Sequence, residues 1–406
     1  MGTIFFGDMH RVIRFFLIIL LASCIFDSQD AAFGLKTPIF ICILLGALVY
    51  SLMNRRKFSL SIINYFLLFS LIIPFLSICI GTIRNGFSFE DITFFTYYKP
   101  YLFLSLTIVL YVTDIDLIKQ VVIILTILSV CSLLIFLIIL PSKELFFILY
   151  GLTSQFGFMN LGYRSYAGID FPFIYFHTTP LLVISISYFS YQFFEKKKRK
   201  YLLFLAINVG AMFLSGTRNN IFMSIVALLA TWFYYTSAKN KLLFLIVGGI
   251  TILATTIAIL PILSEMFSSK EASNLTKLGH LQSYLHEYHD WRTFLFGSGL
   301  GSTFYSQGVG EMTNGTELTY FEIVRRYGVL MGGIVLLLMF YPLTGIKKKN
   351  KEYVWLFIAY GLYLVMIAFN PFFFSSTGMI ILSIVLNKHT QLMFKTVLNK
   401  NIIIAK

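Results

Sequence analysis

The sequence predicts an all-α membrane protein with about 12 transmembrane helices and one large extracytoplasmic loop. Of its 406 residues, 58% are hydrophobic and only 12% are charged, whereas a soluble domain carries about 25% charged residues. The apolar residues come in runs of roughly 17–25, the length that crosses a bilayer as a helix. Because lipid accommodates so much apolar surface, we expect one polytopic membrane domain over residues 1–406.

The individual spans follow from the apolar runs. The first run comes after Arg11 and Arg14 and lacks a convincing cleavage site, so we expect a retained signal-anchor. The predicted spans are 12–27, 37–53, 58–80, 97–113, 117–140, 173–194, 201–215, 220–236, 242–262, 321–345, 353–369 and 373–387. All four cysteines lie within apolar runs without CxxC spacing, which predicts small hydrophobic residues and no disulfide framework.

Clusters of basic residues set the orientation. They fall in the connections 54–57, 113–119, 195–200, 237–241 and 347–351. With both termini in the cytoplasm, these connections are cytoplasmic and most of the 32 Lys and Arg residues lie inside. We therefore expect a protein of the cytoplasmic (inner) membrane. The net charge of +14 is then a topology signal, and we expect no nucleic-acid partner.

Two connections on the outer side are long, residues 141–172 and the large loop, residues 263–318. Long loops of this kind are usually functional or disordered. The large loop is not of low complexity, because apolar side chains recur at helical spacing in it. They are Leu275, Leu278, Leu281, Leu285 and Tyr288. This spacing predicts an amphipathic helix that lies on the outer membrane surface.

An arginine in a tight turn is the strongest local feature. The segment Leu214–Asn220 (LSGTRNN) separates two apolar spans and places Arg218 at the outer membrane edge. An arginine there is costly without a partner, which predicts a phosphate or pyrophosphate contact. The alternative is a snorkelling arginine that anchors a hairpin. Arg164, in a neighbouring outer connection, is a further candidate for the same contact.

The large loop ends in two polar segments. In the first, Trp291–Gly301, three glycines permit a tight turn, and no strand precedes them, which argues against a dinucleotide site. Arg292 beside them is either a second anion contact or a surface residue. In the second segment, Glu317 is either a general base for a sugar hydroxyl or a charge that complements a helix dipole.

Other titratable groups of the loop leave several interpretations open. Glu322 lies on a different helix face from Glu317, and Arg325 and Arg326 pair with acidic residues, bind lipid phosphate or reach back to the loop. The histidines at positions 280, 286 and 289 suggest a solvated face, a phosphate contact at His280 or, less well, zinc. We expect no metal and no cofactor, and the absence of a P-loop disfavours an ATP-driven pump.

Three motifs, in order, resemble the O-antigen polymerase and O-antigen ligase superfamily (Wzy and WaaL). They are Leu214–Asn219, Leu295–Gly301 and the stretch from Glu317 to Gly332. The resemblance covers residues 200–345. It implies a GT-C-like membrane glycosyltransferase that polymerises undecaprenyl-pyrophosphate-linked oligosaccharides into O-antigen or capsular polysaccharide. Its implied partners are these glycolipids, the bilayer and a chain-length regulator protein.

The resemblance also implies residue roles. Arg218 matches the turn arginine that contacts the donor pyrophosphate. Glu317 stands where ligases usually carry a histidine, which favours a polymerase. The loop arginine of many members is missing, and His280 lies nearest its place, with Arg292 and Arg164 as the other candidate pyrophosphate contacts. The alternatives are a ligase that transfers glycan to lipid A-core and a non-enzymatic flippase or exporter.

Overall fold

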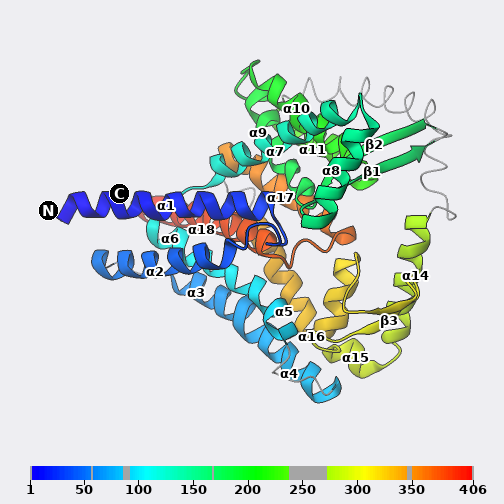
Figure 1. The fold of residues 1–406 in the computed structure, drawn as a ribbon. Helices are drawn as coiled ribbons and strands as arrows, with labels where there is room; N and C mark the ends of the chain where they lie inside the picture. Colours follow the sequence, from blue (N-terminus) through cyan, green and yellow to red (C-terminus); the bar gives the residue numbers. More distant parts are fainter. Residues whose placement is uncertain are drawn as a thin grey trace. The chain divides into compact units, whose positions relative to one another are not determined.

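The structure is a computed structural model that describes residues 2–55, 58–85, 92–166, 169–236, 272–344 and 350–404. These residues are mostly helical, with two antiparallel two-stranded sheets (Figure 1). The chain divides into two compact units. Unit 1 comprises Met1–Val121, His280–Phe357 and Ile367–Lys406, and unit 2 comprises Val122–Gly279 and Ile358–Met366. The predicted span 242–262, the connection 237–241 and loop residues 263–271 lie outside the described residues.

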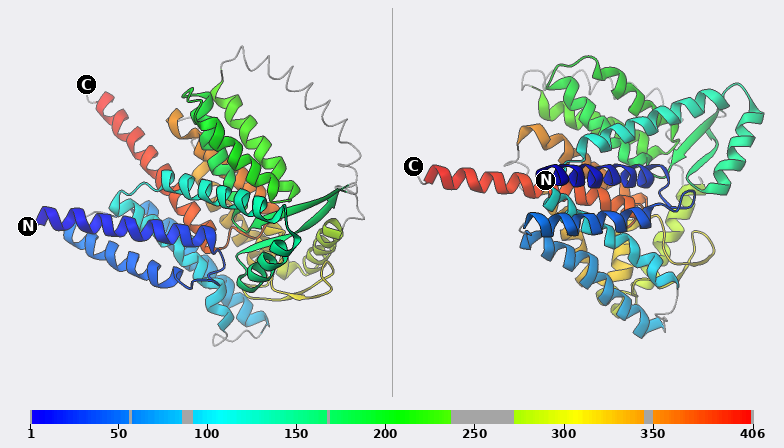
Figure 2. Two further views of the ribbon diagram at one scale, coloured as in Figure 1. Left: turned by 45° about the horizontal axis from the view of Figure 1, so that its top comes forward. Right: turned by 60° about the vertical axis from the view of Figure 1, so that its left-hand side comes forward.

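Unit 1 contains the N-terminal and C-terminal helices and most of the large loop. Its elements are α1 (Gly2–Phe26), α2 (Lys36–Asn54), α3 (Leu60–Phe66), a π-helical segment (Leu67–Ile72), α4 (Ile73–Asn85), α5 (Ile92–Leu102), α6 (Leu106–Thr113), α14 (Ala272–Glu287, which begins in unit 2), α15 (Trp291–Phe296), β3 (Phe304–Ser306), β4 (Glu311–Thr313), α16 (Thr319–Phe340) and α18 (Ser376–Ile404). Helices α1 and α2 lie side by side (Figures 1 and 2), and α18 packs against α1, α5 and α6.

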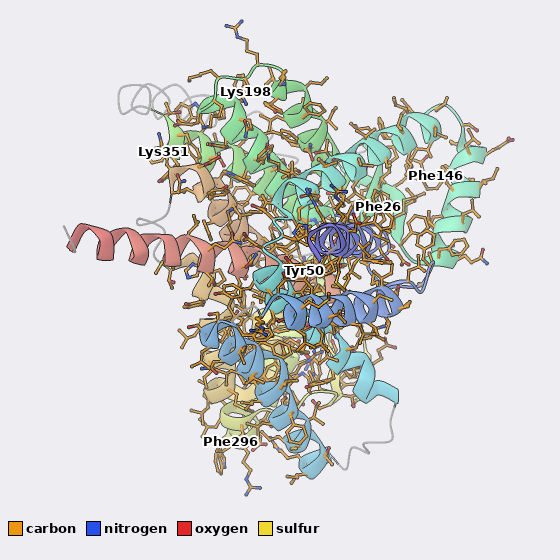
Figure 3. The ribbon with its side chains drawn as sticks, turned by 90° about the vertical axis from the view of Figure 1, so that its left-hand side faces the viewer. Phe26, Tyr50, Phe146, Lys198, Phe296 and Lys351 are labelled. Atoms are coloured by element: carbon orange, nitrogen blue, oxygen red, sulfur yellow. The ribbon has the colours of Figure 1, made fainter. Side chains whose placement is uncertain are left out.

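Unit 2 is built around three packed helices and a hairpin. Its elements are α7 (Ile118–Ile139, which begins in unit 1), α8 (Lys143–Phe156), β1 (Met159–Tyr166), β2 (Ile169–Phe176), α9 (Leu182–Phe194), α10 (Tyr201–Leu214), α11 (Arg218–Tyr235) and the end of α17 (Val354–Met366). Phe146 of α8, labelled in Figure 3, packs on Tyr163 of β1 with ring centroids 4.7 Å apart.

Six of the described helical segments are long and apolar enough to cross a membrane. They are Asp8–Phe26, Lys36–Asn54, Leu60–Arg84, Ile118–Ile139, Thr319–Leu343 and Lys351–Phe369. Each coincides with a span expected from the sequence, so the prediction of a helical membrane protein is confirmed to that extent. The other expected spans stay predictions. Among them, α10 is an apolar helix of only 14 residues, below the roughly 20 that a perpendicular crossing needs.

Strands add to the mostly helical fold and correct one expected span. Strand β1 pairs with β2, and β3 pairs with β4, where the sequence suggested helices and loops alone. The expected span 173–194 begins as strand β2, whose end Phe176 lies opposite Met159, and only its last part is the helix α9. The reason is that residues 171–176 (FPFIYF) are apolar and aromatic, a composition that suits a half-buried strand as well as a membrane helix.

A buried asparagine joins the helices of unit 2. The Oδ1 atom of Asn208 on α10 accepts hydrogen bonds from Ser129 on α7 at 3.0 Å and from Ser185 on α9 at 2.6 Å. Its Nδ2 atom donates to the Phe204 carbonyl at 2.7 Å. Such interhelical hydrogen bonds between polar side chains stabilise packing in lipid. They fix α10, and therefore the turn that follows it.

Candidate functional site

The turn between α10 and α11 in unit 2 is held by its own polar side chains. The Ser215 hydroxyl donates to the Met212 carbonyl at 2.6 Å, and the Asn220 amide donates to Ser215 Oγ at 3.1 Å. Gly216 has φ +63°, and a Cβ atom there would lie 2.6 Å from Cβ of Phe173. Glycine is therefore required at this position, both for the backbone conformation and for the close approach of strand β2.

Two arginines meet at this turn, which we call the arginine turn (Ser215–Arg218). Arg218 is the first residue of α11 and is half-buried. From β1, Arg164 donates through Nη1 to the Gly216 carbonyl at 2.8 Å, and its guanidinium lies 5.3 Å from the Phe173 ring centroid. The structure thus places one predicted anion contact, Arg164, on the turn that carries another, Arg218. The N-terminus of an 18-residue helix adds N–H groups that favour an anion there.

In unit 1 the glycine-rich segment after α15 has a structural role. Gly299 has φ +91°, and a Cβ atom on it would lie 2.2 Å from the Gly81 nitrogen of α4. The N–H groups of Ser298 and Gly299 donate to the carbonyls of Arg325 and Arg326 at 2.7 and 3.2 Å. These amides are therefore engaged with α16 and are not an open cradle for a phosphate.

The partner of this segment is a break inside α16. Gly328 has φ 67° and ψ 174°, which interrupts the helix. Carbonyl groups just before Gly328 therefore do not accept the regular helical hydrogen bonds from residues further along α16. A Cβ atom at Gly328 would lie 2.2 Å from the Leu295 carbonyl oxygen. The Ser77 hydroxyl completes the arrangement by donating to the Arg326 carbonyl at 2.9 Å. Buried carbonyls need such partners, so the glycine segment and the break depend on each other.

Glu322 forms the centre of a buried ionic network in unit 1. Its Oε1 accepts from Arg325 Nη2 at 2.6 Å and from Arg326 Nε, and its Oε2 accepts from Arg325 Nε at 2.9 Å. The Tyr284 hydroxyl of α14 donates to Oε2 at 2.7 Å. Glu322 is 6% exposed and Arg325 is fully buried. Burial of this kind is tolerated only because the charges are paired and hydrogen-bonded.

Arg325 also anchors the large loop. Its Nη1 donates to Ser302 Oγ at 2.7 Å, and its Nη2 donates to the Asn314 carbonyl at 3.1 Å. The guanidinium lies 4.6 Å from the ring centroid of Phe304 in β3. Of the three roles that the sequence left open for this arginine, pairing with an acidic residue and reaching back to the loop both apply.

Within unit 1 the structure brings His280 close to Glu317. The His280 ring is 5% exposed, and its Nδ1 lies 2.6 Å from Ser306 Oγ. Burial lowers the pKa of His280, and the neighbouring Glu317 carboxylate partly opposes this shift. Glu317 itself is exposed. A neutral His280 is a weaker anion contact than the sequence suggested.

The remaining candidates of the loop lie apart from this pair. Arg292 on the short helix α15 is exposed, and its guanidinium lies 5.6 Å from the ring centroid of Trp291. His286 and His289 are exposed, unlike the buried His280. Among the described residues, no group of three His, Cys, Asp or Glu side chains is placed to hold a metal ion.

Helix α14 is present as predicted, with a different buried face. Leu275, Leu278 and Leu285 are about half exposed. The buried side instead carries His280 and Tyr284, and Tyr284 packs with Phe304 and Leu318 in a small core. Leu281 and Tyr288 of the predicted stripe are partly buried against this core, so only Leu275, Leu278 and Leu285 remain available to lipid.

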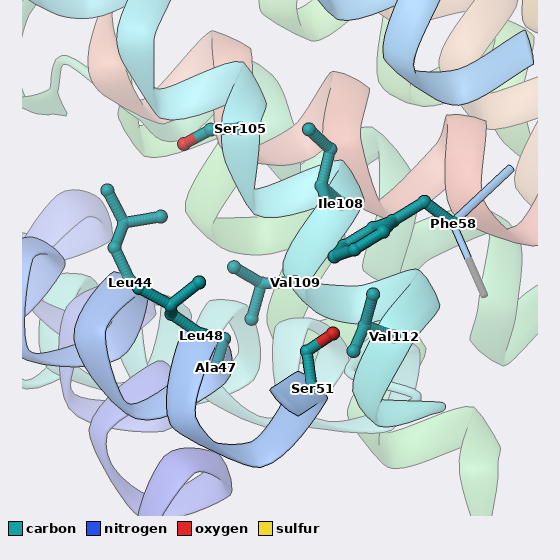
Figure 4. Close-up of a pocket in the computed structure, with 9 residues that line it drawn as sticks. All are labelled: Leu44, Ala47, Leu48, Ser51, Phe58, Ser105, Ile108, Val109 and Val112. Atoms are coloured by element: carbon teal, nitrogen blue, oxygen red, sulfur yellow. The ribbon is translucent and has the colours of Figure 1, made fainter. Parts of the chain in front are cut away.

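Two pockets in unit 1 lack the chemistry of an anion site. One, of about 160 Å³, lies between α2 and α6 and is drawn in Figure 4. Its lining is apolar apart from Ser51 and Ser105. The other, of about 210 Å³, is lined by Tyr65, Tyr341 and His389 among others. It lies at the end of α16 that the charge pattern assigns to the cytoplasm, away from the predicted outer chemistry.

Sequence reasoning missed Tyr284 and Asn314 as members of the network and left the role of Glu322 open. The signal for Glu322 was present, because Arg325 and Arg326 follow it at i+3 and i+4, the spacing of ion pairs on a helix. No comparable local signal marks Tyr284 or Asn314, since both reach α16 through the fold of the loop.

Comparison with known proteins adds no relative: no family model matches the chain, and no curated protein or solved structure shows a significant similarity to it.

Proposed function

We propose that the chain is a membrane glycosyltransferase that polymerises lipid-pyrophosphate-linked oligosaccharide units at the outer face of the cytoplasmic membrane. The products would be O-antigen or capsular polysaccharide. The observation that carries the proposal is the meeting of Arg164 and Arg218 at one turn, where Arg164 bonds the Gly216 carbonyl at 2.8 Å. An arginine bonded to this turn and a second arginine at the first position of α11 suit a pyrophosphate, which carries several negative charges.

The arginine turn would act on the leaving group. When the acceptor attacks the anomeric carbon, the bond from that carbon to the phosphate oxygen breaks and the pyrophosphate leaves with the electron pair. Arg218 and Arg164 would stabilise the charge that develops on it. A charge-assisted hydrogen bond contributes about 1.5–3 kcal/mol, so the loss of one such bond in the transition state slows the reaction roughly 10- to 150-fold.

Glu317 would act on the acceptor. Its exposed carboxylate takes the proton of the attacking sugar hydroxyl, so that the new glycosidic bond forms as the O–H bond breaks. His280 beside it is kept neutral by burial, which lowers its pKa, and it holds Ser306 of β3. In this mechanism His280 positions the loop around Glu317, and the chemistry needs neither a nucleotide sugar nor a metal ion.

The test is the surface polysaccharide of a deletion strain that carries plasmid-borne variants. We expect Arg218→Ala and Glu317→Gln to leave single repeat units on the gel, while the wild-type gene restores long chains. Arg11→Gln removes one positive charge from a side chain that is 83% exposed, and serves as the control that restores long chains. Unchanged chain length in both Arg218→Ala and Glu317→Gln would refute the mechanism.

The same strain separates the alternatives. A ligase defect leaves long polymer that is not attached to lipid A-core. A flippase defect leaves lipid-linked single repeats on the inner leaflet, and a polymerase defect leaves them on the outer leaflet. The leaflet can be determined with a membrane-impermeant glycosidase or lectin applied to spheroplasts.

A further inference from the structure

The ionic network of unit 1 holds more positive than negative charge. Two guanidinium groups, Arg325 and Arg326, share the single carboxylate of Glu322. The Tyr284 hydroxyl also donates to that carboxylate, which therefore accepts hydrogen bonds from three side chains. Among the side chains that the structure describes in this network, one net positive charge is therefore left in a largely desolvated position, where an unbalanced charge is costly.

The two arginines differ in how completely they are bonded. Arg325 uses Nε, Nη1 and Nη2 and is fully buried. Arg326 donates through Nε to Glu322 and through Nη2 to the Asn314 carbonyl at 2.8 Å. Within the described part of the chain its Nη1 has no acceptor, and 14% of its side chain is exposed. The excess charge is thus directed outward at Arg326.

The surroundings of Arg326 hold it in place and leave 14% of its side chain exposed. Its backbone carbonyl is fixed by Gly299 and by Ser77. Its guanidinium lies 5.7 Å from the ring centroid of Tyr97, and the Asn314 amide in turn donates to the Tyr97 hydroxyl. A Cβ atom on Gly315 would lie 2.8 Å from Nη2 of Arg326, so the loop reaches this guanidinium only because it has glycine there.

We infer that Arg326, with Tyr97 and Asn314, forms a second anion subsite that takes the diphosphate of a lipid-linked sugar. This inference rests on the proposed function, in which donor and acceptor are both lipid-linked diphosphates and two diphosphate groups need to be bound. The arginine turn of unit 2 takes one, and Arg326 of unit 1 takes the other. The predicted orientation places the start of α16 at the outer membrane face, where such a headgroup lies.

Binding stoichiometry tests this assignment. The full chain is reconstituted in nanodiscs and titrated with radiolabelled undecaprenyl pyrophosphate. We expect two equivalents for the wild type, one for Arg326→Gln, one for Arg218→Gln and none for the double variant. The lost site should weaken at least about tenfold, the effect of one charge-assisted hydrogen bond to phosphate. Arg11→Gln is the charge-matched control and keeps two equivalents.

A second variant covers a failure of Arg326→Gln to fold. Gly315→Ala keeps every charge and displaces the Arg326 head group, so it should also lose one equivalent.

Inorganic pyrophosphate as competitor identifies the source of the diphosphate. Displacement from both sites supports recognition of the diphosphate itself, and displacement from neither supports recognition of the lipid-borne form.

The outcomes separate the two proposals. If Arg218→Gln loses an equivalent while Arg326→Gln and Gly315→Ala both retain two, the second subsite is refuted and the proposed function stands. If the wild type binds no undecaprenyl pyrophosphate, the proposed function and this inference both fail.

Discussion

At Glu322 a single carboxylate accepts hydrogen bonds from two guanidinium groups and a phenol, all from residues that are largely buried. This differs from a surface ion pair, because loss of the carboxylate would leave Arg325 and Arg326 desolvated without a counter-charge, which lowers the free energy of unfolding. The two arginines hold the end of the large loop that precedes α16, because both donate to the Asn314 carbonyl. One carboxylate therefore supports one of the attachments of the loop to α16, beside the backbone hydrogen bonds from Ser298 and Gly299.

The first prediction concerns this carboxylate. Glu322→Gln should lower the free energy of unfolding by about 3–5 kcal/mol, because it leaves two buried guanidinium groups without a counter-charge. The measurement is a denaturant titration of the purified chain in detergent. Glu311→Gln, on the exposed strand β4, removes the same charge and should change stability by no more than about 0.5 kcal/mol. Equal effects of the two variants would contradict the role given to Glu322.

The second prediction concerns pH. Burial lowers the pKa of His280 from its ordinary value of 6.5. The unfolded chain therefore binds a proton below pH 6.5 more readily than the folded chain does, and folding is disfavoured there. We expect the melting temperature to be highest above pH 6.5 and to fall as the pH drops below it. His280→Gln should reduce this dependence, and His286→Gln, at an exposed position, should not.

At the scale of the element, the loop and α16 fold as one piece. The break at Gly328 frees carbonyls that accept hydrogen bonds from the segment around Gly299 and from Ser77 of α4, and the same segment lies against Gly81 of α4. The sequence predicted a tight turn at these glycines, and three of them have positive φ angles. It did not predict the break in α16, because the partner carbonyls are brought into reach by tertiary packing.

The third prediction compares two glycines of this loop. Gly299→Ala places a Cβ atom 2.2 Å from the Gly81 nitrogen at φ +91°, and should cost about 2–5 kcal/mol through strain and overpacking together. Gly310→Ala has φ +75° with nothing within 4 Å, so only the backbone cost of about 1–2 kcal/mol applies. Limited proteolysis of the loop together with thermal unfolding measures both. A Gly310 variant as unstable as the Gly299 variant would argue against docking on α4.

Helix α14 shows what periodicity can and cannot determine. The spacing of Leu275, Leu278 and Leu285 predicted a helix with an apolar face, and the helix is there. The face that packs inward is the one with His280 and Tyr284. An apolar stripe indicates which side avoids water, but lipid satisfies it as well as a protein core does, so the stripe alone does not identify the buried side.

At the scale of the whole molecule, hydropathy identified the six helical segments of the described residues that are long enough to span a membrane, because each is a continuous apolar run. It did worse where the chain changes structure within an apolar run. Residues 173–176 belong to a strand, and the expected span 97–113 consists of α5 and α6 joined by a short 3₁₀ segment. A hydropathy window averages over such changes, since aromatic residues are compatible with strand and helix alike.

The fourth prediction is the orientation of each unit, on which the location of the chemistry depends. After replacement of the four free cysteines, single cysteines are introduced at exposed positions and labelled with a membrane-impermeant maleimide. In unit 1, Glu311→Cys should react in intact cells and Lys351→Cys only after permeabilisation. In unit 2, Lys143→Cys should react in intact cells, and Lys198→Cys, in the basic connection seen in Figure 3, only after permeabilisation.

This test is decisive because pyrophosphate-linked glycans are polymerised outside the membrane in the proposed mechanism. In the predicted topology α10 is the single crossing between Lys198 and the arginine turn. The two segments are therefore expected on opposite sides of the membrane. If Lys143→Cys and Lys198→Cys reacted from the same side, the expected span that contains α9, which is the one predicted crossing between these two positions, would not cross. Arg218 would then lose its assigned side, and the arginine turn could not be placed at the glycolipid headgroup. The side of the Arg326 subsite in unit 1 depends in the same way on Glu311→Cys and Lys351→Cys.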